Sequence, residues 1–467
     1  MDNGRRKFLK NGALTGAGLF LASLFTPGSL RGAAAEAAEA KASMPAILGG
    51  RKIHAAGWPA WPVWKTPDYE ERVLSVLRSG VWSRAKVTAE FERTWAGMLG
   101  AKRCLSVVNG TNALITALAQ SGIGVGDEVI VTPYTFVASV QAILMNGAIP
   151  VFADVDPETY QIDPENIEKM VTDKTRAILP VHILGIPADM DRILEIGRRH
   201  NLIVIEDACQ AHLAEYDGRK VGTLGHAGCF SFQNSKNLPI GEGGAIVSDD
   251  ETFMDKCYSF HNLGLPYGTQ AGSLAGAFMV GGKVRFSEYQ AAIGLAEIQD
   301  LEKATALRWE NGQYLDHLLR EIPGIKPARM YPKTNRAVYH LFPFRYDKEA
   351  FEGMPRSLFL KALAAEGVPC SSGYAPLHTQ PFIQAAFESR LYKKVYSPEE
   401  LDYKAFLERN ACPKSDTLCN AESVWLSQNM LLTDHAAMDD IATAVEKIHR
   451  YAGKILKAQE REKANFE

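Results

Sequence analysis

Short, almost wholly apolar runs recur along this chain and alternate with stretches that have helical spacing. The runs cover residues 129–132, 150–155, 177–181, 202–205, 229–232 and 244–247. Strands that are apolar along their whole length, with helices between them, are typical of a mostly parallel sheet built from βαβ units and buried on both faces. Residues 189–200 alternate apolar and charged side chains, as a helix crossing such a sheet should. The sequence therefore predicts an α/β fold.

A second pattern begins at residue 287. Ser287 and Gln290 are spaced as a capping box, and apolar residues then recur near one helical face through Leu301. From about residue 306 the chain mixes helices, short strands and Pro/Gly turns, and it ends in a helix expected over about 438–456. We therefore predict a large α/β domain over 45–305 and a smaller α+β domain over 306–467.

Composition excludes several classes of protein. The 51 basic and 54 acidic residues give a net charge of −3, which provides neither the positive surface of a nucleic-acid-binding protein nor a polybasic membrane surface. The 46% of hydrophobic and 22% of charged residues are the proportions of a globular chain rather than of a protein with many membrane spans. The seven cysteines show no paired CxxC spacing, so we predict no metal site.

The first 40 residues are expected to lie outside the fold. Arg5, Arg6 and further basic residues precede a modestly apolar run over 13–25, which is shorter than the ~20 residues of a membrane span. A small-residue stretch over 32–40 offers cleavage sites of the A-x-A kind, and the whole segment looks like a twin-arginine export signal. It predicts an exported, periplasmic protein with no membrane attachment after export. The alternative is a basic tail that does not act as a signal, and the protein would then be cytoplasmic.

Two segments place polar groups where an α/β sheet binds ligands, at strand ends and helix starts. Gly110 and Thr111 open a helix, and backbone N–H groups with the helix dipole make such a turn a phosphate site, although a plain helix cap would look the same. Asp207 directly follows an apolar strand, where a carboxylate either serves a ligand or is merely solvated or capping the next helix.

Two more segments complete the set. Lys236 follows the strand at 229–232 and precedes a glycine turn at 241–244, so burial there would lower its pKa and make the amine nucleophilic, whereas the alternative is an ordinary surface lysine. Phe136 follows another strand and offers a ring to a flat ligand, or it belongs to the core. A phosphate cradle, an acid, an amine and a stacking ring are together what an enzyme needs to hold pyridoxal phosphate and use it as an electron sink.

These motifs, with those at residues 126–131 and 180–182, resemble the pyridoxal-phosphate-dependent sugar aminotransferases of the DegT/DnrJ/StrS type. The resemblance runs from about Leu48 to Ile448 and implies fold type I. Residues 231–236 with 241–244 look most like the branch that aminates keto-cyclitols, which is related to the aminohydroxybenzoate synthases.

The resemblance also implies roles for particular residues. Lys236 would be the Schiff-base lysine, and Asp207 would pair with the pyridine nitrogen. Gln210 would lie near the phenolic oxygen of the cofactor and Phe136 would stack on its ring. The phosphate would be held by Gly110, Thr111 and Ser231.

Two further segments are less regular. The family usually places an asparagine from the neighbouring subunit of a homodimer at the phosphate, but this chain has Lys283 there, which either reaches the phosphate or forms a salt bridge elsewhere. Residues 373–378 resemble the segment bordering the substrate pocket, so Tyr374 and His378 are candidate substrate residues, with a structural histidine as the alternative for His378.

The resemblance implies a transaminase that moves an amino group from glutamine or glutamate to a keto-sugar or keto-cyclitol, with donor and acceptor using one site in turn. Two rivals remain open. A sugar dehydratase of the same fold would have histidine in place of the Schiff-base lysine, and Lys236 argues against it. A non-catalytic sensor that binds pyridoxal phosphate or a sugar would keep the fold without turnover. An exported enzyme would meet free sugars or cyclitols rather than nucleotide-activated ones.

Overall fold

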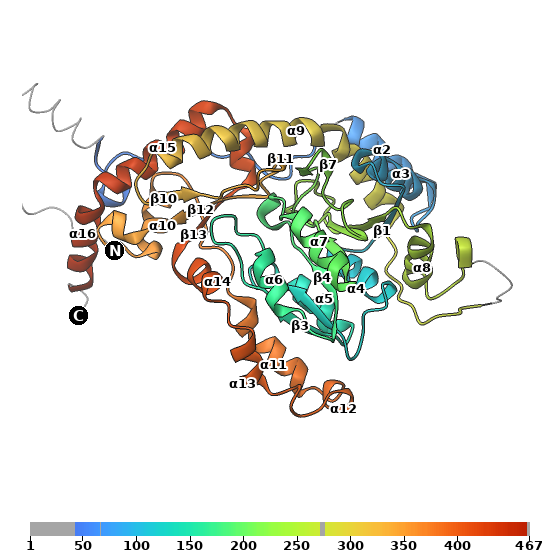
Figure 1. Cartoon of the computed structure of the whole chain (residues 1–467). Helices are drawn as coiled ribbons and strands as arrows, with labels where there is room; N and C mark the ends of the chain where they lie inside the picture. The colour runs from blue at the N-terminus through green and yellow to red at the C-terminus, as the bar shows by residue number, and fades with distance from the viewer. Residues whose placement is uncertain (1–42, 66, 271–275, 465–467) are drawn as a thin grey trace, which may run out of the picture.

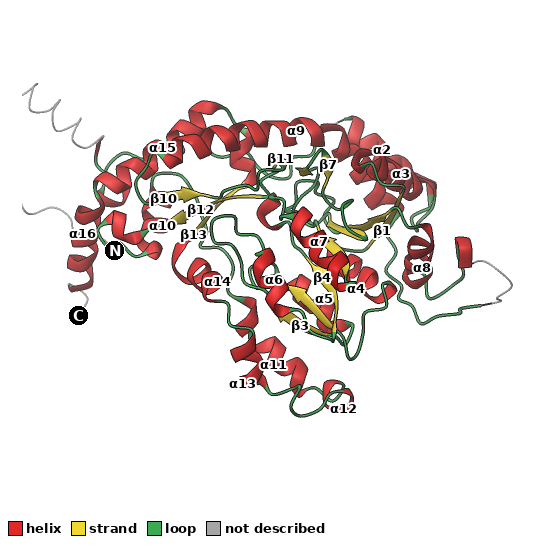
Figure 2. Ribbon diagram, in the orientation of Figure 1, coloured by secondary structure: helices red, strands yellow, loops and turns green. Residues whose placement is uncertain are grey.

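The computed structural model describes residues 43–65, 67–270 and 276–464, so the expected export signal lies outside the described residues. Its centre is a seven-stranded sheet with the order β1-β9-β8-β5-β4-β2-β3 (Figures 1 and 2). The strands of this sheet are β1 (Arg103–Val107), β2 (Glu128–Val131), β3 (Ile149–Phe152), β4 (Thr175–Leu179), β5 (Ile203–Asp207), β8 (Ala227–Ser231) and β9 (Gly244–Ser248). The block from β3 to β8 is parallel, and β9 pairs antiparallel with both β8 and β1.

All six expected strands are present, and the mostly parallel sheet is confirmed. The sequence pattern missed β1, whose run Arg-Cys-Leu-Ser-Val is neither continuously apolar nor long. This strand lies at the edge of the sheet beside β9, where polar residues are tolerated.

Helices cover both faces of the sheet, as continuous apolar strands require. Val129 and Val131 point into a core shared with α4 and α5, whereas Ile130 between them packs into a second core with α3, α7 and α9. The helices of the large domain are α2 (Asp68–Ser79), α3 (Lys86–Leu99), α4 (Gly110–Gln120), α5 (Val137–Met145), α6 (Pro164–Met170), α7 (Met190–His200) and α8 (Glu251–His261). The helix expected over 189–200 is thus α7, with Asp189 at its N-cap.

The long helix α9 (Glu288–Arg320) runs along the top of the molecule and joins the two halves (Figure 1). It begins at the expected capping box, in which the backbone N–H of Ser287 donates to Gln290 Oε1 at 3.2 Å. The domain boundary expected at 305/306 falls within this helix, because α9 contributes its first turns to the large-domain core and its last turns to the small one.

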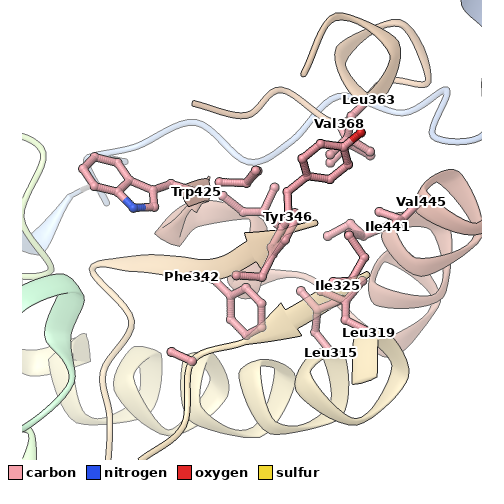
Figure 3. Close-up of a cluster of buried hydrophobic side chains, with 14 of the residues drawn as sticks. Leu315, Leu319, Ile325, Phe342, Tyr346, Leu363, Val368, Trp425, Ile441 and Val445 are labelled. Carbon is pink, nitrogen blue, oxygen red and sulfur yellow. The ribbon is translucent and has the colours of Figure 1, made fainter. Parts of the chain in front are cut away.

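The C-terminal part of the chain forms a second layer around the sheet β10-β12-β13. Its core joins the end of α9 to the aromatic residues of β12 and to the apolar face of α15 (Figure 3). The elements are β10 (Ile325–Pro327), β12 (Leu341–Tyr346), α10 (Arg356–Ala365), α14 (Pro413–Thr417), β13 (Ser423–Ser427), α15 (His435–Arg450) and α16 (Ala452–Ala464), and a separate small sheet contains β6 (Glu215–Tyr216), β7 (Arg219–Lys220) and β11 (Thr334–Arg336). The single helix expected over about 438–456 is wrong: it is two helices, because the backbone of Tyr451 leaves the helical conformation.

A helical excursion from the small domain returns to the large one. The helices α11 (Pro381–Glu388), α12 (Tyr392–Val395) and α13 (Tyr403–Arg409) lie below β3 in Figure 1. The hydroxyl of Tyr392 donates to the carbonyl of Ala148 at 2.9 Å, and Arg409 forms an ion pair with Glu128 at 2.8 Å. The excursion therefore holds the two domains together at the amino ends of β2 and β3.

Within the described residues, no helix is both long and apolar enough to cross a membrane.

Candidate active site

A cavity of about 470 Å³ lies at the carboxyl ends of the parallel strands. We refer to it as the strand-end cavity. Its lining includes eight residues selected from the sequence, namely Gly110, Thr111, Phe136, Asp207, Gln210, Ser231, Lys236 and Tyr374. They come from five separate parts of the chain. The sheet brings seven of them together because its strands end at one edge, and Tyr374 joins them from the small domain.

The N-terminus of α4 forms one wall of this cavity. Asn109 caps the helix, with its side-chain oxygen accepting the backbone N–H of Asn112 at 2.8 Å. A Cβ added to Gly110 would lie 2.7 Å from Ser231 Cβ and 2.8 Å from Cys209 Sγ, so only glycine fits between these neighbours. The first N–H groups of a helix have no intrahelical partner, and of the residues that carry them Gly110 and Thr111 line the cavity. This wall can hold an anion.

Asp207 ends β5 and is only 4% exposed. One carboxylate oxygen accepts the hydroxyl of Ser139 at 2.7 Å, and the other accepts the backbone N–H of Cys209 at 3.1 Å. Two donors fix the orientation of the group while leaving further lone pairs for a ligand. A buried carboxylate held in this way suits a partner that brings a proton or a positive charge.

Lys236 lies in the loop after β8 and lines the cavity. Its backbone is fixed at both ends, since its N–H donates to Gln233 O at 2.8 Å and its carbonyl accepts the indole N–H of Trp61 at 3.0 Å. Its amine forms no hydrogen bond or ion pair within the described part of the chain. Burial lowers the pKa of this amine, and the nearby Cys209 and Asp207 oppose the shift. An amine with a lowered pKa is closer to the neutral, nucleophilic form.

Gln210 connects the two domains across the cavity. Its Oε1 accepts the backbone N–H of Leu184 at 2.9 Å, and its Nε2 donates to the hydroxyl of Tyr374 at 2.7 Å. Burial also raises the pKa of Tyr374, so its hydroxyl stays protonated near neutral pH. Both side chains are therefore held in fixed orientations.

Phe136 directly precedes α5 and is 53% exposed, although it is a large apolar side chain. It lines the strand-end cavity instead of packing into the core. A flat ligand in the cavity has a ring available for stacking.

His340 was missed by the sequence analysis. It precedes β12 in the small domain and lines the strand-end cavity although it is 7% exposed. Its Nδ1 is buried without a hydrogen-bond partner among the described residues, and burial lowers the pKa of the ring well below its ordinary value. A neutral imidazole thus lines the cavity, with its Nδ1 buried behind the surface. It precedes a strand instead of following one and no glycine turn adjoins it, so the strand-end pattern that located the other residues did not indicate it.

Two selected residues do not line the cavity. Lys283 is exposed, and its amine donates to Asn262 Oδ1 at 3.2 Å. His378 is 2% exposed, with its Nε2 3.5 Å from an oxygen of Asp416 and its ring against Phe152. Within a single chain, neither residue belongs to this site.

Comparison with known proteins finds relatives that extend over nearly the same length. The chain is 34% identical over 424 residues to the L-glutamine:2-deoxy-scyllo-inosose aminotransferase of Streptoalloteichus tenebrarius, which covers 88% of this chain and 98% of that protein. It is likewise 34% identical over 422 residues to the enzyme of that name from Streptomyces kanamyceticus, covering 87% and 97% of the two chains.

Solved structures give the same picture. The crystal structure of 3-amino-5-hydroxybenzoic acid synthase matches with a TM-score of 0.72 and 32% identity, covering 84% of this chain and 99% of that one. An aminotransferase from Psychrobacter cryohalolentis matches with a TM-score of 0.74 and 30% identity, covering 85% and 99%. Residues 65–397 match the DegT/DnrJ/EryC1/StrS aminotransferase family. The chain therefore belongs to this family, and its fold is that of the fold type I aminotransferases.

Proposed function

We propose that this protein is a pyridoxal-phosphate-dependent transaminase that moves an amino group from glutamine to a keto-cyclitol. The observation that carries the proposal is the unpaired, buried amine of Lys236 in the same cavity as the fixed carboxylate of Asp207. Glutamine and a keto-cyclitol are chosen because the relatives that match over 97–98% of their own length are named for those substrates.

The residues of the strand-end cavity fit this cofactor. The close approach of Gly110 to Ser231 leaves a narrow cradle beside Thr111 that suits a phosphate. Asp207 lies at the end of the neighbouring strand as a partner for a protonated ring nitrogen, and Phe136 offers a face for stacking. Lys236 supplies an amine that no described side chain neutralises.

Bound there, the cofactor would supply an electron sink for the negative charge that develops at the substrate carbon. Asp207 would hold a proton on the ring nitrogen by remaining an anion. Lys236, displaced by the amine of the donor, would carry the proton away from the donor Cα and later return a proton to the acceptor carbon. Gln210 and Tyr374 would keep the orientation of the bound molecules fixed, because each is hydrogen-bonded to the other. Donor and acceptor would use the cavity in turn.

The proposal includes a homodimer that places Lys283 near the phosphate of the neighbouring subunit. The supporting observation is a set of exposed apolar side chains beside residues 281–288. Leu263 bonds to the backbone of Gly282, and Trp82, 53% exposed, bonds to that of Glu288. Val280 is 93% exposed. Apolar groups in such positions are commonly covered by another subunit. Light scattering after gel filtration should give twice the mass of one chain, and Trp82→Glu should lower it.

We also propose export by the twin-arginine route, which rests on residues 1–40 alone. A reporter protein joined to these residues should reach the periplasm, and replacing Arg5 and Arg6 by lysine should keep it in the cytoplasm. A reporter that stays in the cytoplasm with both arginines present would contradict this part of the proposal.

The central experiment locates the covalent bond. Purified protein should be yellow, should lose that absorbance on addition of glutamine and should regain it with a keto-inositol. Borohydride treatment followed by peptide mass spectrometry should find the pyridoxyl group on Lys236. Colour that does not respond to glutamine or glutamate would favour the sensor, and release of water from a sugar without amino transfer would favour the dehydratase.

A further inference from the structure

A second cavity, of about 320 Å³, lies between α9 and the segment that precedes α2. We refer to it as the Trp61 cavity. Its apolar wall comes from Pro59, Leu301, Leu307 and Leu432, and its polar groups include Asn237 and Glu297. It shares a stretch of backbone with the strand-end cavity, because Lys236 lines one cavity and Asn237 lines the other.

Asn237 provides an unused acceptor. The residue is 2% exposed, and its Nδ2 donates to Val338 O at 2.8 Å. Its Oδ1 is buried and has no hydrogen-bond partner in the part of the chain that the structure describes. A buried amide oxygen left in this state costs free energy, so an occupant that donates a hydrogen bond would be stabilised.

Glu297 provides a second acceptor without a partner. It forms no hydrogen bond or ion pair within the described residues, and burial raises the pKa of its carboxyl from 4.5 to about 7. The acid and base nearest to it already neutralise each other, because Lys65 bonds to Asp300 at 2.6 Å. Lys303 on the rim is exposed. Glu297 and Lys303 are therefore the charged groups of the lining that form no ion pair among the described residues, and Glu297 is the one whose pKa burial shifts.

The wall between the two cavities is held rigidly. Trp61 lines the second cavity while its indole N–H donates to the carbonyl of Lys236 at 3.0 Å. Arg308, fully buried and without a hydrogen-bond partner among the described residues, lies over the Trp61 ring at 4.8 Å from its centre but is not part of the lining. Asn429 also donates to Pro59 O at 2.6 Å, which fixes the start of this segment.

We propose that the Trp61 cavity binds a small polyol that carries a primary ammonium group. The ammonium would pair with Glu297, a further donor would reach Asn237 Oδ1, and the carbon ring would lie against the leucines. This is the chemical class of an amino-cyclitol, and the suggestion that the natural occupant is the product of the reaction rests on the proposed function. The site itself rests only on the chemistry of the cavity.

Calorimetry with 1-amino-1-deoxy-scyllo-inositol tests the proposal. Holoprotein is first reduced with borohydride, so that the strand-end cavity stays filled and cannot react. One molecule of the amine should bind per chain, and Glu297→Gln should weaken binding at least tenfold. Uncharged scyllo-inositol should bind at least tenfold more weakly than the amine. The matched control is Glu310→Gln, an exposed carboxylate on the same helix outside the cavity, which should leave the affinity unchanged.

Absence of binding, binding unaffected by Glu297→Gln, or equal binding of the uncharged polyol would each overturn the proposal. The two proposals fail separately. A protein that transaminates but binds no amine after reduction retains the proposed function and loses the second site, whereas a protein with Glu297-dependent binding and no transamination does the reverse.

Discussion

The two cavities on either side of the Lys236–Asn237 peptide make an instructive pair. Each contains a titratable group that forms no hydrogen bond or ion pair among the described residues and whose pKa burial shifts, Lys236 in the strand-end cavity and Glu297 in the Trp61 cavity. Burial shifts the pKa of both toward the uncharged form, downward for the amine and upward for the carboxyl. The physical cause is the same, although only one of the cavities has the groups for a reaction.

The difference lies in what surrounds the titratable group. Lys236 faces a fixed carboxylate, a helix N-terminus and a stacking ring, all delivered by strand ends. Glu297 lies on α9 near Lys65 and Asp300, in a cavity otherwise lined largely by apolar side chains. A shifted pKa thus indicates a place where a ligand gains by binding, and the arrangement of the neighbouring polar groups decides whether chemistry follows.

The largest expected effect is the loss of transamination when the Lys236 amine is removed from the strand-end cavity. Lys236→Ala should reduce the transamination rate by a factor on the order of a thousand or more, because the nucleophile and the proton carrier are lost together. Stopped-flow measurement of amino transfer from glutamine checks this. Lys361→Ala removes an exposed lysine of α10 and should change nothing. Turnover by the Lys236 variant near the wild-type rate would rule out the assigned role.

The next effect concerns the cradle. Gly110→Ala would push a methyl group against Ser231 and Cys209, so the backbone must shift, and we expect a loss of about 1–3 kcal/mol in stability together with weaker cofactor binding. Gly97→Ala is the control, since its Cβ would meet nothing within 4 Å inside α3 and should stabilise the protein by about 0.5–1 kcal/mol. Urea unfolding measures the stability of the two variants, and cofactor titration measures their affinity for the cofactor. Normal cofactor affinity in Gly110→Ala would show that the cradle is wider than the structure indicates.

Glu297 in the Trp61 cavity should make the stability of the folded protein depend on pH. Because the pKa of Glu297 is raised to about 7 in the folded protein, the folded state binds this proton more tightly than the unfolded state, and stability falls as pH rises from about 4.5 through 7. Glu297→Gln cannot ionise, so it should be more stable than the wild type at pH 8 by about 1–2 kcal/mol and not at pH 4. Urea unfolding at the two pH values measures the difference. If the unfolding free energies of the variant and the wild type differ by the same amount at pH 8 and pH 4, Glu297 is not desolvated in the folded protein.

The smallest effect tests the residue that sequence patterns missed. His340→Phe keeps a ring in the strand-end cavity and removes both ring nitrogens as hydrogen-bonding groups, so we expect kcat/KM for the acceptor to fall about fivefold to tenfold. Cofactor absorbance should be unchanged, which separates substrate contact from damage to the site. Unaltered kinetics with several acceptors would show that the His340 ring makes no contact with the acceptor.

Much of this molecule follows from local patterns. Continuous apolar strands predict burial on both faces, and the acid that ends β5 and the lysine after β8 therefore had to reach one edge of the sheet. The same reasoning failed for β1, because an edge strand with arginine and serine lacks that pattern. It also failed at Tyr451, because the nearby Gly453 lies inside α16 and not at the break between α15 and α16.

The sequence by itself determined the fold class, the family and the residues at the strand ends, since periodicity and short motifs express local geometry. Only the tertiary structure decided that His340 joins the cavity, that His378 turns toward Asp416, and that Trp61, Asn237 and Glu297 enclose a second one. Those arrangements depend on the packing of segments far apart in the chain, and contacts at such separations leave no periodic trace in the sequence.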